Sequence, residues 1–385
     1  LFLLLCQSLA LAAGGGPKLR VGLAVDQFSA QISSAGKIKV VEPGGRTTVL
    51  QPGSHFISVK DGSLYADQKK LGSSQISLLA ADAKNPVLVH QKKYRGALTV
   101  LLNSGKKNLT LVNTLPLEQY LYGVVAKEVL PLWPDEAIKA QAVAARSFAL
   151  YSLDHGKYPN FDIRANELGQ VYGGINAEHA NTTKLVDATS GVAALYEGDP
   201  IQAVFHSSGG GYTEAASAVW GKDIPYLQAG PDYDQDSPKF SWNRVFTKVQ
   251  LTRLLSQGGY ELGDLQGIRL SARTAPPMRW TPDRGISGRV KRMTFVGSEK
   301  SITLTGSQVR SLLDLDSALF DIRIGLERPK ELDVTITNGY GYPIGKKTIP
   351  ISGDKKSGTE GASVGDMRLF TNVDGEKVIF TGNGF

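Results

Sequence analysis

The chain changes pattern at Pro116, and this change constrains its fold more than any other feature. Before Pro116, short β-prone runs are separated by PGG, PG and DG turn signals, which predicts a small all-β unit. After it, residues 117–129 have helical period, and a second helical segment over residues 134–153 contains six alanines. That second segment is apolar almost all round, so we expect a buried, closely packed helix. Strand-like runs return from residue 192, and the sequence therefore predicts an α+β fold, in which a mixed helix and strand core follows a smaller N-terminal β-rich domain.

The 385 residues are enough for two or three domains. We expect four parts along the chain: residues 1–13 as a partial signal peptide, 14–96 as the β-rich accessory domain, 97–330 as the mixed core, and 331–385 as a C-terminal β-like part of that core.

The N-terminal segment is typical of a secretory signal peptide. Residues 1–11 form an apolar run too short to span a bilayer, and residues 10–12 have the A-x-A pattern of a cleavage site. The alternative is a buried N-terminal strand. No Met or basic residue precedes the run, so we expect the natural start to lie upstream. The bulky Leu5 disfavours a lipoprotein anchor at Cys6, and a single cysteine excludes an internal disulfide and a CxxC centre. We therefore expect an exported, cysteine-free mature protein.

A formal net charge of +7 favours an anionic partner, which could be nucleic acid, a membrane surface or an anionic wall polymer. The expected export favours the wall polymer and a place in the extracytoplasmic cell envelope. The basic residues form no arginine-rich run, so we expect no nucleic-acid partner.

Glu128 is the first candidate for chemistry. At about 100° per residue, Leu117, Leu121 and Val124 share one stripe of the predicted helix, and Glu128 falls in the middle of it near the helix end. Desolvation and the negative end of the helix dipole both disfavour the charged carboxylate, which raises its pKa. A carboxylic acid that donates a proton near neutral pH needs such a shift. The alternative is a helix-end residue whose side chain turns out to solvent.

The second candidate is HSSGGG at residues 206–211, which follows the β-prone run IQAVFH at 201–206. We expect a strand there that ends in a histidine, two hydroxyls and three glycines. Such a strand end lets backbone amides and small donors approach sugar hydroxyls or an oxyanion closely. One alternative is a glycine-rich loop without function. Another is a serine-type esterase or peptidase that uses Ser207 or Ser208, although the sequence is not a G-x-S-x-G elbow.

Two metal-site patterns are incomplete. Residues 232–236 resemble the start of a calcium loop, but Ser237 stands where glycine is required and Asn243 where Glu is required. The five histidines show no H-x-x-x-H spacing, so a structural zinc site is not supported. We expect no metal and no cofactor.

Several motifs occur in one order along the chain. They are LPLEQYLYGVVAKEVLPLWPDEAIKAQAVAARSFALY (115–151), QVYGG (170–174), AEHANTTKLVDATSG (177–191), PIQAVFHSSGGGYTE (200–214), VWGKDIPYL (219–227) and SGRVKRMTFVG (287–297). Together they resemble the stage II sporulation protein D family, which also includes amidase-enhancer proteins, over roughly residues 97–325. Family members continue beyond the TGNGF found here at 381–385 into a Gly-His-Gly segment, so we expect the natural chain to extend further.

The resemblance implies a lytic transglycosylase that acts on peptidoglycan. Such enzymes cleave the bond between N-acetylmuramic acid and N-acetylglucosamine without water and leave a 1,6-anhydro end, and peptide-stripped glycan strands are the expected substrate. The family's catalytic acid occupies the position of Glu128, in AKEVLP. One carboxylate suffices, because it first protonates the leaving oxygen and then takes the proton of the C6 hydroxyl. Glycoside hydrolases instead use two carboxylates.

The resemblance also implies which residues bind or orient the glycan. In chain order, the expected substrate-binding residues are Lys139, Gln141, Arg146, Tyr172, His206, Ser207, Ser208, Gly209, Gly210 and Tyr212. Some relatives hold zinc through cysteines near the glycine-rich loop. No cysteine exists here at that place, in keeping with the expectation of no metal.

A rival interpretation is a non-catalytic protein that binds glycan and stimulates a cell-wall amidase, as the amidase-enhancer name suggests. A module that only binds should tolerate Glu128→Gln, and a serine enzyme should be labelled by a serine-directed inhibitor. The N-terminal β-rich domain carries no identifiable chemistry. It is either an accessory wall-binding domain or a docking surface for an amidase or another envelope protein.

Overall fold

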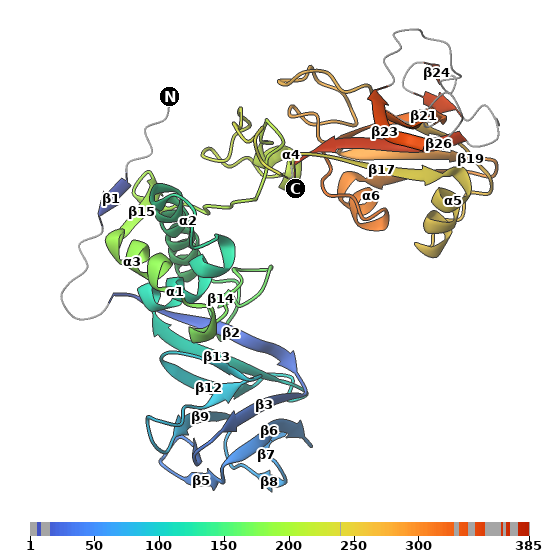
Figure 1. Ribbon diagram of the computed structural model, residues 1–385. Coiled ribbons are helices and arrows are strands. Elements are labelled where there is room, and N and C mark those ends of the chain that lie inside the picture. Colours follow the sequence, from blue (N-terminus) through green and yellow to red (C-terminus); the bar gives the residue numbers. More distant parts are fainter. Residues whose placement is uncertain are drawn as a thin grey trace. The chain divides into compact units, whose positions relative to one another are not determined.

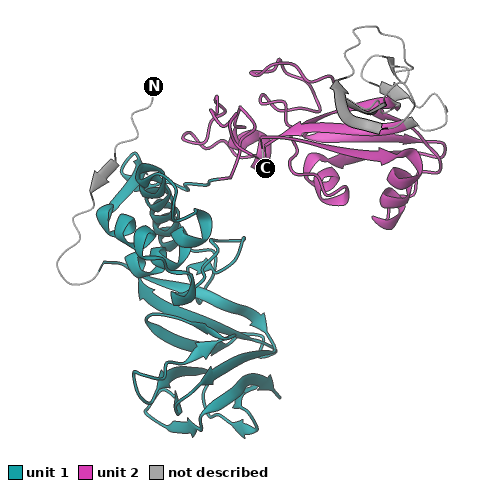
Figure 2. Cartoon of the chain, in the orientation of Figure 1, with its two compact units in different colours: residues 1–205 teal, residues 206–385 magenta. Residues whose placement is uncertain are grey.

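The computed structural model describes residues 6–8, 16–238, 240–326, 331–337, 343–350, 363–364, 367–369 and 376–384. The chain divides into two compact units, residues 1–205 and 206–385, which are described separately (Figure 2). Most of the predicted signal peptide lies outside the described residues, and only β1 (Cys6–Ser8) falls within it. In the described part of the chain, no helix is both long and apolar enough to cross a membrane.

Two β-sheets pack face to face in the first half of unit 1 (Figure 1). In spatial order, the larger sheet contains β14 (Ile163–Arg164), β2 (Lys18–Gln27), β13 (Leu109–Pro116), β12 (Ala97–Leu102), β9 (Gln75–Ala80), β4 (Ile38–Val41) and β5 (Thr47–Leu50). The smaller sheet contains β11 (Lys92–Lys93), β10 (Leu88–Val89), β3 (Ser29–Ser34), β6 (Gly53–Lys60), β7 (Ser63–Ala66) and β8 (Lys69–Lys70). Only β14 and β2 pair in parallel within these two sheets.

Alternation of side chains along the strands builds the apolar layer between the sheets. In β4, for example, Ile38 and Val40 are fully buried whereas Lys39 is exposed. The two edge strands of the smaller sheet, β8 and β11, each consist of two exposed lysines. Charged side chains on short edge strands discourage pairing with another chain, so these lysines protect the sheet edges.

Three helices in unit 1 pack where β2 begins and β13 ends (Figure 1). Strand β13 runs directly into α1 (Leu117–Glu128), and α2 (Asp135–Asp154) and α3 (Ala180–Ala188) pack beside it. Acidic side chains occupy the first turn of α2, where the helix dipole favours negative charge. One face of α2 is buried, with fully buried alanines at positions 142, 145 and 149, whereas most of its other residues are partly or fully exposed, so the helix is less completely buried than its composition predicted.

Shorter elements complete unit 1. They are the 3-10 helix η1 (Ile175–Ala177) and a small antiparallel sheet of β1, β15 (Val192–Tyr196) and β16 (Asp199–Pro200). The strand predicted over residues 201–206 is wrong. The amides of Ala203 and Val204 donate to carbonyl oxygens two residues earlier (2.8 and 2.9 Å), and such local bonds take the place of a strand ladder.

Unit 2 is built from strands and short helices around one core. Its described strands are β17 (Ser241–Thr247), β18 (Leu265–Arg269), β19 (Arg292–Gly297), β20 (Ser301–Thr305), β21 (Phe320–Leu326), β22 (Glu331–Thr337), β23 (Pro343–Pro350), β24 (Ser363–Val364), β25 (Met367–Leu369) and β26 (Glu376–Asn383). Its helices are α4 (Ala216–Trp220), α5 (Lys248–Gln257) and α6 (Gly306–Leu312). Strands β17, β26 and β21 form one sheet, and β20, β19, β18, β25 and β24 form another.

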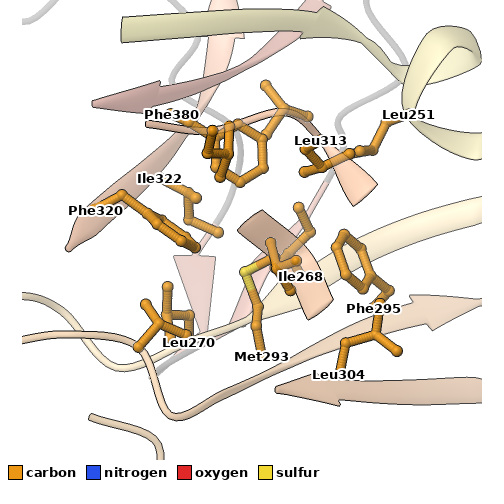
Figure 3. Packing of buried hydrophobic residues seen from close by; sticks show 14 of the residues in the cluster. Leu251, Ile268, Leu270, Met293, Phe295, Leu304, Leu313, Phe320, Ile322 and Phe380 are labelled. Carbon is orange, nitrogen blue, oxygen red and sulfur yellow. The ribbon is translucent and has the colours of Figure 1, made fainter. Parts of the chain in front are cut away.

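The core of unit 2 joins these sheets to α5 and α6 (Figure 3). Phe320 and Phe380 meet edge-on, with ring centroids 5.5 Å apart, and Phe295 and Ile268 enter the same cluster from the second sheet. The predicted α+β fold class is confirmed. The boundary between the two compact units lies between residues 205 and 206. The sequence interpretation instead placed boundaries near residues 96 and 330. The larger sheet of unit 1 runs across the first of these two positions.

Candidate acid–base site

Glu128 is the last residue of α1, and its side chain is half-buried. Burial raises the pKa of its carboxyl group, and the backbone amide of Val171 and the ammonium group of Lys127 offset only part of that rise. The net shift is upward, as the sequence predicted. The apolar stripe is also as predicted, because Leu121 and Val124 are fully buried. A carboxyl group in this state keeps its proton to higher pH than an exposed one, which suits a proton donor.

The amide that reaches this acid belongs to residues 170–174, a segment that crosses α1. The backbone N–H of Gly173 donates to the carbonyl oxygen of Gly123 within the helix (3.1 Å). A Cβ atom on Gly123 would lie 2.7 Å from the ring of Tyr172, closer than real side chains approach. Glycine at position 123 therefore permits the close approach that brings Val171 beside the carboxyl group.

The side chain of Tyr172, which belongs to this segment, is buried among other aromatic rings. Its side chain is 4% exposed, and its ring centroid lies 4.9 Å from that of Tyr120 and 5.6 Å from that of Tyr94. Its hydroxyl donates to Oδ1 of Asn113 (3.3 Å), and burial raises the pKa of Tyr172. In the structure, the ring of Tyr172 packs against those of Tyr94 and Tyr120. Its predicted contact with substrate stays a prediction.

The helix hairpin brings the first turns of α2 near the last turn of α1, because only residues 129–134 join the two helices. Gln141 lies in the second turn of α2 and is half-buried. Its Nε2 atom is buried and has no hydrogen-bond partner among the described residues, which is rare for a buried amide nitrogen. Lys139 forms an ion pair with Glu136 (2.6 Å) at the start of the same helix. The predicted contacts of Gln141 and Lys139 with glycan stay predictions.

Arg146 differs from its expected place on a polar strip of α2. It is 1% exposed, and its guanidinium group forms a two-bond ion pair with Glu118 on α1 (2.9 and 2.8 Å). It also donates to the carbonyl oxygens of Val186 (3.2 Å) and Val192 (2.9 Å). Its hydrogen-bond donors serve the protein interior, so any effect of Arg146 on a glycan would act through the position of these elements.

The glycine-rich loop at 206–211 belongs to unit 2, where Asp234 organises it. The carboxylate of Asp234 accepts hydrogen bonds from the Ser208 hydroxyl and from the amides of Gly210 (2.9 Å) and Gly211 (2.8 Å). Burial alone would raise the pKa of Asp234, but these hydrogen bonds outweigh it and lower the pKa on balance. Donors that the sequence assigned to glycan binding are therefore already engaged inside the loop.

Two further side chains hold the same loop. Asp232 accepts the amide of Gly209 (3.1 Å) and lies 3.6 Å from Nε2 of His206, whose imidazole is about half-exposed. Arg289 donates to the carbonyl oxygens of Gly209 and Tyr212 (both 2.7 Å). The sequence interpretation missed all three supporting residues. The available signals were the D-x-D spacing at 232–234, set aside as a calcium pattern, and the basic SGRVKR run.

The predicted residues thus fall into two groups. Unit 1 holds Glu128, Lys139, Gln141, Arg146 and Tyr172, and unit 2 holds His206, Ser207, Ser208, Gly209, Gly210 and Tyr212. Ser207 is exposed, and Tyr212 is partly buried. Within the described ranges, no three histidine, cysteine or acidic side chains are grouped so that they could hold a metal ion.

The fold and site define an α+β protein of two units with a half-buried carboxylic acid at a helix end, and the comparisons give the family. Residues 105–196, which include α1, α2 and α3, match the SpoIID family, described as Stage II sporulation protein. Stage II sporulation protein D of Bacillus amyloliquefaciens is 30% identical over 273 residues, which are 66% of this chain and 72% of that protein. The chain therefore belongs to the stage II sporulation protein D family.

Two further relatives agree with this assignment. Stage II sporulation protein D of Bacillus subtilis (strain 168) is 29% identical over 276 residues, which are 66% of this chain and 72% of that protein. The Amidase enhancer of the same organism is 31% identical over 201 residues, which are 52% of this chain and 27% of that protein.

Proposed function

We propose that this protein acts on the bacterial cell wall as a lytic transglycosylase, with Glu128 as its general acid and base. The observation that carries this proposal is the half-buried carboxyl group at the end of α1, whose pKa burial raises. The names of the family relatives, which refer to sporulation and to an amidase enhancer, support a role in cell-wall metabolism.

In this reaction, Glu128 first donates its proton to the oxygen that joins N-acetylmuramic acid to N-acetylglucosamine. The bond from C1 to that oxygen breaks, and positive charge develops at C1 of the N-acetylmuramic acid. The C6 hydroxyl of the same sugar then bonds to C1, and its proton passes to the carboxylate of Glu128. The enzyme returns to its starting state, no water is consumed, and the product has a 1,6-anhydro end. A raised pKa suits the first step, and the Val171 amide stabilises the carboxylate between the steps.

Each unit contributes its own candidate donors for a glycan strand. On α2 the candidates are Gln141, whose buried Nε2 has no hydrogen-bond partner among the described residues, and Lys139, which lies two residues earlier. The exposed His206 and Ser207 of unit 2 are the members of the glycine-rich loop best placed to meet a ligand. We further propose an extracytoplasmic location, since peptidoglycan lies outside the cytoplasm.

The test is digestion of purified peptide-stripped and native glycan strands, followed by mass spectrometry of the fragments. We expect fragments one water lighter than hydrolysis products, and none with Glu128→Gln. The matched control is Glu167→Gln, because Glu167 is an exposed carboxylate of the same unit. Full activity of Glu128→Gln would refute the role of Glu128. Fragments with hydrated ends would show that the reaction is hydrolysis and not transglycosylation.

A second candidate function is non-catalytic stimulation of a cell-wall amidase, which the amidase-enhancer relative supports. The protein would then bind glycan and raise amidase activity without cleaving the strand itself. Equal stimulation of a purified cell-wall amidase by wild type and Glu128→Gln, with no strand cleavage by either, would favour this second function.

A further inference from the structure

The positive charge of the chain is concentrated in one part of it. Residues 16–116, which form most of the two packed sheets of unit 1, contain 14 lysine and arginine residues against five aspartate and glutamate residues, a formal charge of +9. The whole chain has +7 and residues 1–15 are uncharged, so residues 117–385 carry −2. Such an asymmetry indicates a partner of opposite charge for the basic part alone.

The excess charge consists of unpaired lysines. All eleven lysines of residues 16–116 are exposed, and none forms an ion pair with another described residue. The three arginines of the same region, in contrast, each form an ion pair with a carboxylate. The lysines are Lys18, Lys37, Lys39, Lys60, Lys69, Lys70, Lys84, Lys92, Lys93, Lys106 and Lys107.

The acidic side chains of the region do little to balance these lysines, because four of the five contact other groups. Glu42 is 5% exposed and pairs with Arg46 (3.5 Å), and Asp67 pairs with His55 (2.7 Å). Asp82 accepts two backbone amides of its own turn, and the fourth carboxylate accepts a side-chain amide (2.7 Å). The region therefore presents free ammonium groups to its surroundings.

The lysines lie on several sides of the two sheets. Strands β8 and β11, each made of two lysines, are the opposite edges of the six-stranded smaller sheet, so five strand spacings of about 4.8 Å place them roughly 24 Å apart. Lys39 is exposed between two buried residues of β4 and therefore projects from the outer face of the larger sheet. Lys106 and Lys107 lie in the turn between β12 and β13.

This spread distinguishes between two kinds of anionic partner. A membrane surface is flat and meets one side of a domain, and its attraction for charges falls off within a Debye length of about 8–10 Å. Lysines on the other sides would add little to membrane binding. A flexible polymer can follow the surface and contact several sides at once, so the distribution of the lysines favours a polymer.

We propose that residues 16–116 bind a flexible anionic polymer of the cell envelope that carries repeated phosphodiester groups, and thereby hold the protein in the wall. An ammonium group is a point charge, whereas a guanidinium group favours a planar, two-bond partner. Unpaired lysines therefore suit phosphates whose positions vary along a flexible chain. The place of the polymer rests on the extracytoplasmic location proposed above, but the charge distribution does not depend on the proposed reaction.

The test is calorimetry of the full chain with purified poly(glycerol phosphate), a polymer of this class, at several salt concentrations. We expect binding that weakens as salt rises, because salt screens exposed charges. Two double variants, Lys92→Gln with Lys93→Gln and Lys106→Gln with Lys107→Gln, should each lower the affinity about fivefold. The matched control is Lys222→Gln with Lys300→Gln, a pair of exposed lysines in unit 2, which should bind as the wild type does.

Absence of polymer binding, or an equal loss of affinity in the control variant, would overturn the inference. Loss confined to one of the two double variants would also overturn it, because a polymer that contacts several sides needs both lysine pairs. In that case, binding to phosphatidylglycerol vesicles that is lost in the same double variant would assign the surface to a membrane. All six substituted lysines are exposed, so we expect every variant to fold, which circular dichroism would verify.

The proposed lytic activity is tested separately from this binding. If Glu128→Gln binds the polymer as the wild type does while no form of the protein cleaves glycan strands, the polymer site holds and the lytic activity fails. If the protein cleaves phosphate-free glycan strands but does not bind the polymer, the lytic activity holds and the polymer site fails.

Discussion

Replacement of Glu118 by glutamine tests the interpretation of Arg146 as an interior residue. The change keeps the size of the side chain and removes the charge that balances a guanidinium group with 1% exposure. Breaking a buried pair from one side leaves an uncompensated charge and costs about 3–5 kcal/mol. Because the Glu118 side chain is itself 21% exposed and water can partly replace it, we expect the lower end, about 3 kcal/mol.

Native-state hydrogen exchange followed by mass spectrometry is the appropriate assay, because a chain of two units need not unfold in one step. Amides in α1 and α2 should lose protection by this amount, whereas those of unit 2 should not change. The matched control is Glu136→Gln, which removes the other Glu ion pair of α2. Glu136 is 84% exposed, so its variant should lose no measurable stability.

A loss below about 1 kcal/mol in Glu118→Gln would refute the reasoning, since that is the value of an exposed ion pair. A second measurement separates structure from substrate contact. If Arg146 acts only through the interior, Glu118→Gln and Arg146→Lys should lose glycan binding only in proportion to their loss of folded protein. Loss of glycan binding by a fully folded Arg146→Lys variant would instead indicate that Arg146 contacts the glycan directly.

Individual contacts give four further predictions. Because folding raises the pKa of Glu128 from 4.5, the folded state binds more protons than the unfolded state, and the free energy of unfolding should fall as pH rises through the raised pKa; calorimetry should show that Glu128→Gln removes this fall. Asp234→Asn should increase amide exchange in the glycine-rich loop, at a cost of about 1–3 kcal/mol, and unchanged exchange would contradict the assignment. Gly123→Ala should lower stability by about 1–3 kcal/mol in denaturant unfolding, because the new methyl group meets an aromatic ring at 2.7 Å. Replacing both Lys69 and Lys70 by threonine should promote self-association in light scattering, while a chain that stays monomeric would argue against edge protection.

The fold class and the helix pair could be predicted because local pattern decides them. Prolines at 116 and 134 precede both helices, and the apolar period fixes their buried faces. Local pattern alone could not show whether the strand expected at 201–206 forms. Its residues alternate as a strand does, but no neighbouring strand in the described part of the chain completes a ladder with it, and pairing partners are not a local property.

In the candidate site too, features that a single helix determines could be predicted, whereas contacts between elements could not. The position of Glu128 on an apolar stripe gave the direction of its pKa shift, because the helix alone determines which face a side chain occupies. The partner of Arg146 lies 28 residues away on another helix, and Asp234 lies 26 residues from Ser208. Such contacts depend on how elements pack, so a sequence that shows a basic strip or a glycine-rich loop does not show that its donors are already engaged.

The environment of Glu128 differs from that of the other charged groups described above. Burial that raises the pKa of Glu128 stabilises its protonated form and disfavours its charged form in the folded chain. Burial that serves only stability would favour an apolar residue at this position of the stripe. Other polar groups are arranged differently: in unit 1, Glu118 and Arg146 form an ion pair, and in unit 2, Asp234 accepts hydrogen bonds from the amides of Gly210 and Gly211. A partly buried acid whose pKa burial raises, with one backbone amide as support, has the properties that a proton-transfer site requires, and this supports the role proposed for Glu128.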